Sequence, residues 1–169
     1  QIRIINHEHN KGLPSARKTG VSAASGEYII HCDSDDWVDL SMYEILYKEA
    51  IRHNADIVFC DFFIAFSNGE CMKISQKADD ADGKTYIHRL LLQQVHGSCC
   101  NKLIRKSIIS NDIEYPKYNM REDLALMIQI FYKARRVSYV NQGLYYYFSN
   151  TTSISNGLTY DSIENRFRQ

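Results

Sequence analysis

The chain has 169 residues, 44% of them hydrophobic and 24% charged, which fits one globular domain and excludes disordered and fibrous classes. Twenty basic residues balance twenty acidic ones, so no excess positive charge attracts nucleic acid, and no apolar run reaches the roughly 18 residues of a membrane span. Five cysteines with no Cys-x-x-Cys pair favour reduced thiols over a disulfide framework or a zinc site.

The first 66 residues alternate between strand-like and helix-like patterns. Residues 2–5, 27–32 and 57–66 are rich in β-branched and aromatic side chains and are predicted strands. Between them, residues 13–24 are a predicted helix with Pro14 suited to its first turn and Gly26 just past its end. Residues 42–50 carry apolar side chains at helical spacing. This alternation predicts crossover units, and therefore parallel pairing in an α/β sheet.

The second half of the chain is less regular. Asn68-Gly69 is typical of a tight turn, and it separates strand-like segments that end at residue 66 and begin at residue 71. The other predicted elements are a charged loop at 78–84, a helix at 86–94, a strand or hairpin at 102–109, a buried helix at 122–134 and one or two strands at 137–148. Residues 151–169 give no clear pattern.

Four carboxylates follow the second predicted strand within seven positions: Asp33, Asp35, Asp36 and Asp39. Their mutual repulsion is unfavourable unless water or a cation offsets it, and oxygen ligands of this kind suit Mg²⁺ or Mn²⁺. Ligands of α/β sheets bind beyond the carboxyl ends of strands, which is where this run lies. The interpretation without a metal is a solvated acidic turn in which Asp39 begins the next helix.

A second metal-dependent class also fits part of the acidic run. Asp33-Ser34-Asp35 is similar to the paired aspartates of phosphoryl-transfer hydrolases. Those enzymes need an exposed nucleophile, further acidic motifs downstream and a small hydroxyl residue at the position of Trp37. A metal-dependent phosphoryl-transfer hydrolase is therefore the weaker alternative.

Several ordered segments resemble family 2 glycosyltransferases. Residues 10–20, Asn-Lys-Gly-Leu-Pro-Ser-Ala-Arg-Lys-Thr-Gly, resemble the family's Asn-x-Gly-x-x-x-Ala-Arg-Asn-x-Gly segment, and residues 24–36 continue into an acidic run that resembles its DxD motif. The later matches are Asn101-Lys102-Leu103, Glu122-Asp123, Tyr146-Tyr147 and Ser153-Ile154-Ser155. The resemblance implies a GT-A fold, a Rossmann-like α/β domain whose mixed, mainly parallel sheet is flanked by helices.

The resemblance also implies a cation site. Asp33 and Asp35 would bracket the ribose and a Mg²⁺ or Mn²⁺ ion, with Asp35 the direct ligand and Asp36 assisting through water. The donor itself would be a UDP- or GDP-type sugar.

The resemblance also implies which residues contact the donor and which residue acts as the catalytic base. Asn10, Arg17 and Lys102, together with the acidic run, would contact the donor. Asp123, with Glu122 beside it, would accept the proton of the acceptor hydroxyl. Without the resemblance, the two acidic residues would only complement the positive end of a helix, at roughly 0.3–1 kcal/mol each.

The function implied is metal-dependent, inverting sugar transfer to a glycan or other hydroxyl acceptor in bacterial polysaccharide synthesis. The expected location is the cytoplasm, or the inner face of the membrane in the full-length protein. The family's first strand–helix–strand unit, which holds the nucleotide base, has no counterpart, so residues 1–169 are interpreted as one N-terminally truncated catalytic domain that is inactive alone. A non-catalytic nucleotide-sugar-binding remnant is the alternative.

Overall fold

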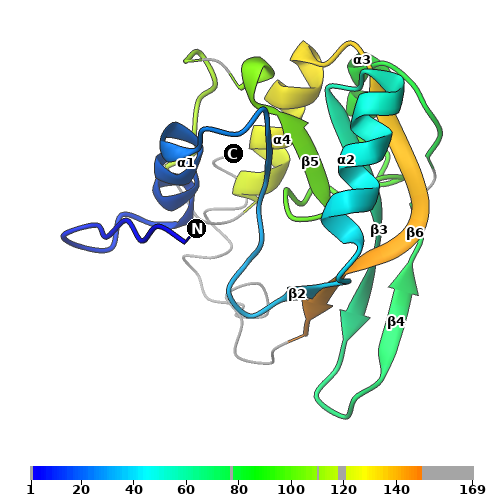
Figure 1. Ribbon diagram of the computed structural model, residues 1–169, viewed down its shortest axis with the longest axis horizontal. Helices are drawn as coiled ribbons and strands as arrows, with labels where there is room; N and C mark the ends of the chain where they lie inside the picture. Colours follow the sequence, from blue (N-terminus) through cyan, green and yellow to red (C-terminus); the bar gives the residue numbers. More distant parts are fainter. Residues whose placement is uncertain (1, 77, 110, 118–120, 150–169) are drawn as a thin grey trace.

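The computed structural model describes residues 2–76, 78–109, 111–117 and 121–149 (Figure 1). Its elements, in chain order, are α1 (Leu13–Ala23), β1 (Tyr28–Ile30), β2 (Trp37–Val38), α2 (Met42–His53), β3 (Ile57–Ala65), β4 (Cys71–Ile74), α3 (Gly83–Leu91), β5 (Lys102–Arg105), the 3-10 helix η1 (Lys106–Ile108), α4 (Glu122–Lys133) and β6 (Val137–Phe148). None of the helices in these ranges combines the length and hydropathy that crossing a membrane requires.

The six strands form one mixed sheet in the order β1-β5-β3-β6-β2, and β4 pairs with β3 as a hairpin. The predicted α/β fold with a mixed sheet is confirmed. The expected predominance of parallel pairs is wrong, because β3–β6 is the only parallel pair of named strands among the described residues. Strand β5 explains the difference: it lies between β1 and β3 and is antiparallel to both.

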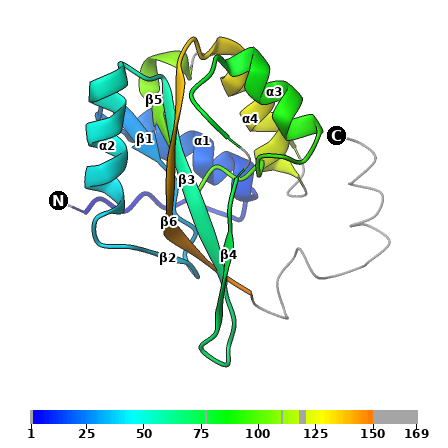
Figure 2. The ribbon, with the colours of Figure 1, turned by 90° about the vertical axis from the view of Figure 1, so that its right-hand side faces the viewer.

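The sheet separates two apolar cores, and the alternation of side chains along β3 supplies both. Ile57 and Phe59 pack under α3 and α4, whereas Val58, Cys60 and Phe62 pack under α2. Figure 2 shows the sheet nearly edge-on, with α2 on one side and α3 and α4 on the other. Burial on both faces accounts for the continuous apolar run of β3.

Helix α2 begins differently from the pattern that its sequence suggests. Ser41 and Glu44 fit a capping box, but the Ser41 side chain makes no capping hydrogen bond and Glu44 pairs with Lys48. Asp39 organises the turn instead, because its Oδ1 accepts the Ser41 N–H over 2.8 Å and also the Ser41 hydroxyl. The expected role of Asp39 at the helix start is therefore close to what the structure shows.

Two other predictions differ from the structure, and one lies outside it. Residues 2–5 form no strand, and Ile2 and Ile4 are 94% and 79% exposed, since no described strand lies beside them. Helix α3 begins at Gly83 rather than at residue 86, because the Asp82 side chain caps it by accepting the Thr85 N–H. The segment 151–169 lies outside the described residues.

Candidate functional site

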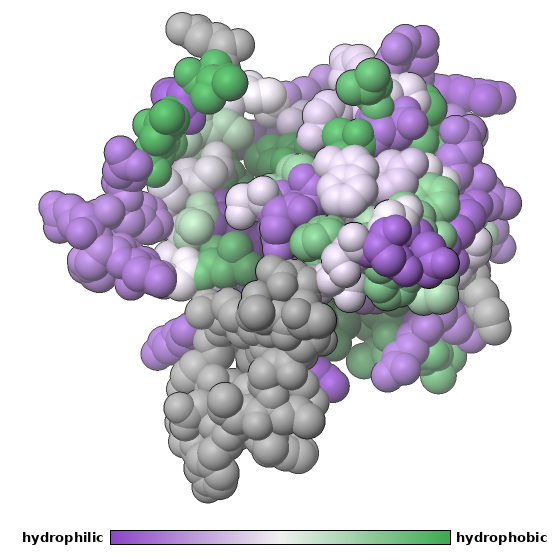
Figure 3. All heavy atoms as spheres, turned by 90° about the horizontal axis from the view of Figure 1, so that it is seen from below, coloured by the Kyte–Doolittle hydropathy of each residue, from purple (hydrophilic) through white to green (hydrophobic). Residues whose placement is uncertain are grey.

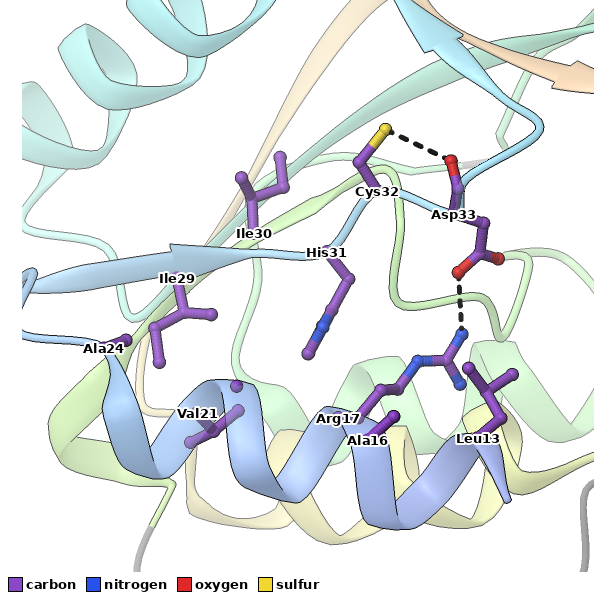
Figure 4. A pocket seen from close by; sticks show the side chains of 11 residues that line it. Leu13, Ala16, Arg17, Val21, Ala24, Ile29, Ile30, His31, Cys32 and Asp33 are labelled. Atoms are coloured by element: carbon purple, nitrogen blue, oxygen red, sulfur yellow. Dashed lines mark hydrogen bonds and ion pairs between the residues drawn. The ribbon is translucent and has the colours of Figure 1, made fainter. Parts of the chain in front are cut away.

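An arginine on α1 joins two acidic segments that lie far apart in the sequence. Arg17 is only 6% exposed, and its Nη1 lies 2.7 Å from Oε1 of Glu122 and also donates to Oδ1 of Asp123. Its Nη2 lies 3.4 Å from Oδ1 of Asp33, and Figure 4 shows the guanidinium extending from the helix to this carboxylate. The acidic turn after β1 and the start of α4 therefore meet at one point.

Three carboxylates share this one buried cation. Burial alone would lower the pKa of Arg17, but the charges of Asp123 and Asp33 help to raise it above its usual value, so the guanidinium stays protonated. Burial raises the pKa of Glu122 from 4.5 to about 7, and the negative charge of Asp123 adds to the rise. Glu122 therefore holds a proton up to near-neutral pH.

Glu122→Gln is expected to become more stable relative to the parent chain as the pH rises from about 5 to about 8. The folded pKa of Glu122 lies above its unfolded value, so the folded state binds more protons between about pH 4.5 and 7, and its stability falls as the pH rises through this window. The relative gain should approach roughly 2 kcal/mol, measured as the free energy of unfolding in urea at each pH.

The difference between the two proteins isolates the effect of Glu122. Burial lowers the pKa of His96 to about 4, which makes stability depend on pH in the opposite sense, but this contribution is the same in both proteins. A difference that does not vary with pH would contradict the buried, protonated state of Glu122.

The segment before β5 holds the second oxygen of Asp123. The backbone N–H of Cys99 donates to Oδ2 of Asp123 over 3.1 Å. Lys102 is fully buried, and burial lowers its pKa to about 8. Its Nζ donates to three oxygens of the same segment: the carbonyls of His96 (2.8 Å) and Ser98 (2.7 Å) and Oδ1 of Asn101 (2.7 Å). A donor phosphate could bind Lys102 only by breaking one of these bonds, so the structure favours a supporting role.

The acidic turn is fastened to β6 through Asp36. Its Oδ1 accepts the N–H of Phe148 over 2.9 Å, and its Oδ2 accepts the hydroxyl of Tyr145. The same hydroxyl accepts the N–H of Asp33 over 3.3 Å. Burial raises the pKa of Asp36. Asp36 thus anchors the turn, whereas Asp35 is exposed and accepts no hydrogen bond from the described residues.

These placements limit how the turn could hold a cation. Across the described ranges, no three His, Cys, Asp or Glu side chains converge closely enough to hold a metal ion by themselves. Asp35 is open and Asp33 is shared with Arg17, so two carboxylates of the turn remain for an ion. Mg²⁺ is commonly held by one or two carboxylates together with waters and substrate phosphates. The residues present therefore fit an ion that the turn shares with a diphosphate.

A hollow of about 360 Å³ lies beside Asp33, between α1 and the chain from β1 to the acidic turn. Val21 and Ile29 contribute to its apolar wall, and Arg17 also borders it. Figure 4 shows His31 pointing from the strand side toward α1. Burial lowers the pKa of His31, so this ring is neutral near pH 7. The hollow gives a ligand room next to two predicted donor contacts.

Asn10, the remaining predicted donor contact, has a local structural role. Its Oδ1 accepts the N–H of Gly12 over 2.9 Å, immediately before α1. Gly12 has φ of 82°, a conformation that favours glycine. The side chain of Asn10 is exposed, so a donor could still reach it.

Two supports of the site are not evident from the sequence. The tyrosine run 145–147 fits sheet core and rim, yet the hydroxyl of Tyr145 fixes the acidic turn. Asn101 is 1% exposed and donates to the carbonyl of Cys60 in β3, which attaches the segment before β5 to the sheet. The only sequence signal for Asn101 is its place beside Lys102 in a family-like segment.

The chain is similar to known proteins over most of its length. The family model described as Glycosyl transferase family 2 matches residues 1–112. Cholesterol galactosyltransferase of Borreliella burgdorferi is 32% identical over 173 residues, which cover 94% of this chain and 47% of that protein. WfgD of Escherichia coli, a UDP-Glc:α-D-GlcNAc-diphosphoundecaprenol β-1,3-glucosyltransferase, is 25% identical over 143 residues, covering 85% of this chain and 53% of that protein.

A solved structure shares the fold. The crystal structure of S. aureus TarS 1–349 in complex with UDP-GlcNAc aligns with a TM-score of 0.74 and 21% identity, over 96% of this chain and 47% of that one. The chain spans about half the length of the relatives and the structure that it matches.

Proposed function

The chain belongs to glycosyl transferase family 2, and we propose that it forms part of an enzyme that transfers a sugar from a nucleotide-diphosphate donor to a hydroxyl acceptor. The cluster around Arg17 carries the proposal, because it brings Asp33 of the acidic turn and Asp123 of α4 to one point. Sugar transfer needs a group that stabilises the leaving diphosphate and a base for the incoming hydroxyl. The UDP-glucose for which WfgD is named and the UDP-GlcNAc in the TarS complex support a nucleotide-sugar donor.

In this proposal, Asp35 and Asp33 hold a Mg²⁺ or Mn²⁺ ion. When bound, the ion would neutralise negative charge on the leaving diphosphate. Asp36 contributes by keeping the turn in place through its bonds to β6, and it could reach the ion through water. Arg17 holds Asp33 from the protein side, which fixes the carboxylate near the start of α4.

Asp123 is the proposed base. Arg17 and the Cys99 N–H each occupy one of its oxygens, and this leaves further lone pairs on both oxygens for a hydroxyl proton. The acceptor oxygen would form a bond to the anomeric carbon while the bond from that carbon to the diphosphate breaks, and Asp123 would take the proton. This single displacement inverts the anomeric centre. The bacterial sources of the relatives support a role in bacterial glycan synthesis.

Isothermal titration calorimetry with UDP-glucose, UDP-GlcNAc and GDP-mannose, with and without Mn²⁺, tests the proposal. Saturable binding of one donor that strengthens with Mn²⁺ supports it. Failure of the folded complete enzyme to bind any of these donors would contradict it. Donor binding without transfer to any acceptor would instead favour a non-catalytic nucleotide-sugar-binding module.

Asp35→Ala is expected to abolish the binding of Mn²⁺ measured by titration, because Asp35 supplies the open carboxylate of the turn. Asp39→Ala is the matched control from the same acidic run. Its carboxylate is occupied by Ser41, so Mn²⁺ binding should persist in that variant. Equal Mn²⁺ affinity in Asp35→Ala and the parent chain would show that the assignment is wrong.

A further inference from the structure

Three aromatic rings from neighbouring strands stack in a column at one end of the sheet. The Trp37 and Tyr146 rings lie 5.5 Å apart with 8° between their planes, and the Tyr146 and Phe63 rings lie 4.9 Å apart with 15° between theirs. The residues face one another in register across β2, β6 and β3. Phe148 lies beside the column, 6.3 Å from Trp37.

The column ends at Trp37, whose outer ring face is open. Strand β2 is the last strand in the sheet order, so no further described strand covers the indole, and Trp37 is 44% exposed. Gly143 makes room at the other end, because a Cβ at this position would lie 2.4 Å from the Phe63 ring. The stacked rings thus present a fixed aromatic surface to solvent.

This surface lies on the same face of the sheet as the start of α4. Val38 and Tyr145 pack with the core under α2, and neighbouring residues of a strand point to opposite faces. Trp37 and Tyr146 therefore point to the other face, which α3 and α4 cover farther along the sheet. Figure 3 shows the molecule from the end that is lowest in Figure 1, where residues of intermediate and high hydropathy gather among hydrophilic ones.

The aromatic surface formed by Trp37 and Tyr146 is also attached to the acidic turn. Trp37 follows Asp35 and Asp36 directly in the chain, and the bond from the Phe148 N–H to Asp36 ties the turn to the strand that carries Tyr146. A ligand on the indole would therefore lie next to the proposed donor site.

We propose that the outer face of Trp37 is the platform on which a pyranose ring of the acceptor stacks, an inference that rests on the proposed function. One face of a pyranose carries C–H groups and is apolar, so it can cover an aromatic ring while its hydroxyls remain solvated. Tyr146 and Phe63 hold the indole from behind, so little side-chain freedom is lost on binding. The pyranose ring would thereby lie beside the acidic turn, on the face of the sheet that α4 covers.

Trp37 is the only tryptophan in the chain, so its fluorescence reports on the platform directly. We expect methyl β-glucopyranoside or methyl β-galactopyranoside to change its emission saturably and to protect it from acrylamide quenching. Sorbitol has similar hydroxyl groups but no ring and should have no such effect. A response to sorbitol equal to that of the pyranosides, or a response to UDP alone with none to the pyranosides, would overturn the assignment.

Kinetics of transfer supply the second test. In the complete enzyme, Trp37→Ala should raise the acceptor KM about tenfold and leave the calorimetric affinity for the donor unchanged, whereas Trp37→Phe should restore part of the loss because it keeps a ring. Tyr132→Ala, a 68% exposed aromatic at the far end of α4, is the matched control and should change neither quantity.

The two proposals can fail separately. An unchanged acceptor KM in Trp37→Ala with normal donor binding would contradict the platform alone. Absence of donor binding by the complete enzyme would contradict the proposed function, and the fluorescence titration would still decide whether sugars stack on Trp37.

Discussion

Asp123→Asn is expected to lower the rate of sugar transfer in the complete enzyme by about 10²–10⁴-fold while the donor still binds. Asparagine keeps the size of the side chain, and its carbonyl oxygen can still accept the bond from Arg17. It cannot take a proton from the acceptor hydroxyl. The measurement is kcat from a transfer assay, together with the donor affinity from calorimetry.

Glu122→Gln serves as the comparison, because Glu122 shares Arg17 with Asp123. It should reduce kcat much less if Asp123 is the base. If Glu122 were the base instead, its raised pKa would appear in the pH dependence of the rate. A rate that increases through about pH 7, and loses this increase in Glu122→Gln, would assign the proton transfer to Glu122 instead.

Local patterns predicted many of the elements correctly. The Asn68-Gly69 turn joins β3 and β4, and α4 starts at Glu122 as its apolar pattern indicates. Such local patterns do not determine which distant strands pair with each other. An alternating or apolar run shows that a strand is buried but does not identify its neighbour, so the insertion of β5 between β1 and β3 was not predictable.

In the site as well, the sequence indicated which residues carry chemistry but did not indicate which residues they contact. The acidic turn and the Glu122-Asp123 pair were recognisable as chemistry-bearing segments, and the structure joins them. The role of Arg17 was not recognisable, because a guanidinium binds phosphate and carboxylate with the same geometry. Only the fold shows that its partners are carboxylates of its own chain. Lys102 likewise has no sequence feature that distinguishes a buried ammonium from an exposed one.

Arg17→Met is expected to lower the free energy of unfolding by about 3–5 kcal/mol, because it leaves buried carboxylates without their counter-charge. The side chain of Arg17 is 4% exposed, and those of Glu122 and Asp123 are 10% and 20% exposed, so water compensates little. Methionine fills a similar length without charge. Urea unfolding near pH 7 measures the loss, and the loss should shrink at acid pH, where protonation removes the repulsion between the carboxyl groups.

Two variants separate the buried cluster from ordinary ion pairing. Lys48→Met breaks an exposed pair with Glu44 on α2, where both side chains are more than half exposed, and should leave the unfolding free energy nearly unchanged. Adding Asp123→Asn to Arg17→Met should restore part of the lost stability, because one of the uncompensated charges is removed. If Arg17→Met costs no more than Lys48→Met, or if the double variant is no more stable than Arg17→Met, Arg17 does not hold the acidic turn and α4 together in the way that its contacts indicate.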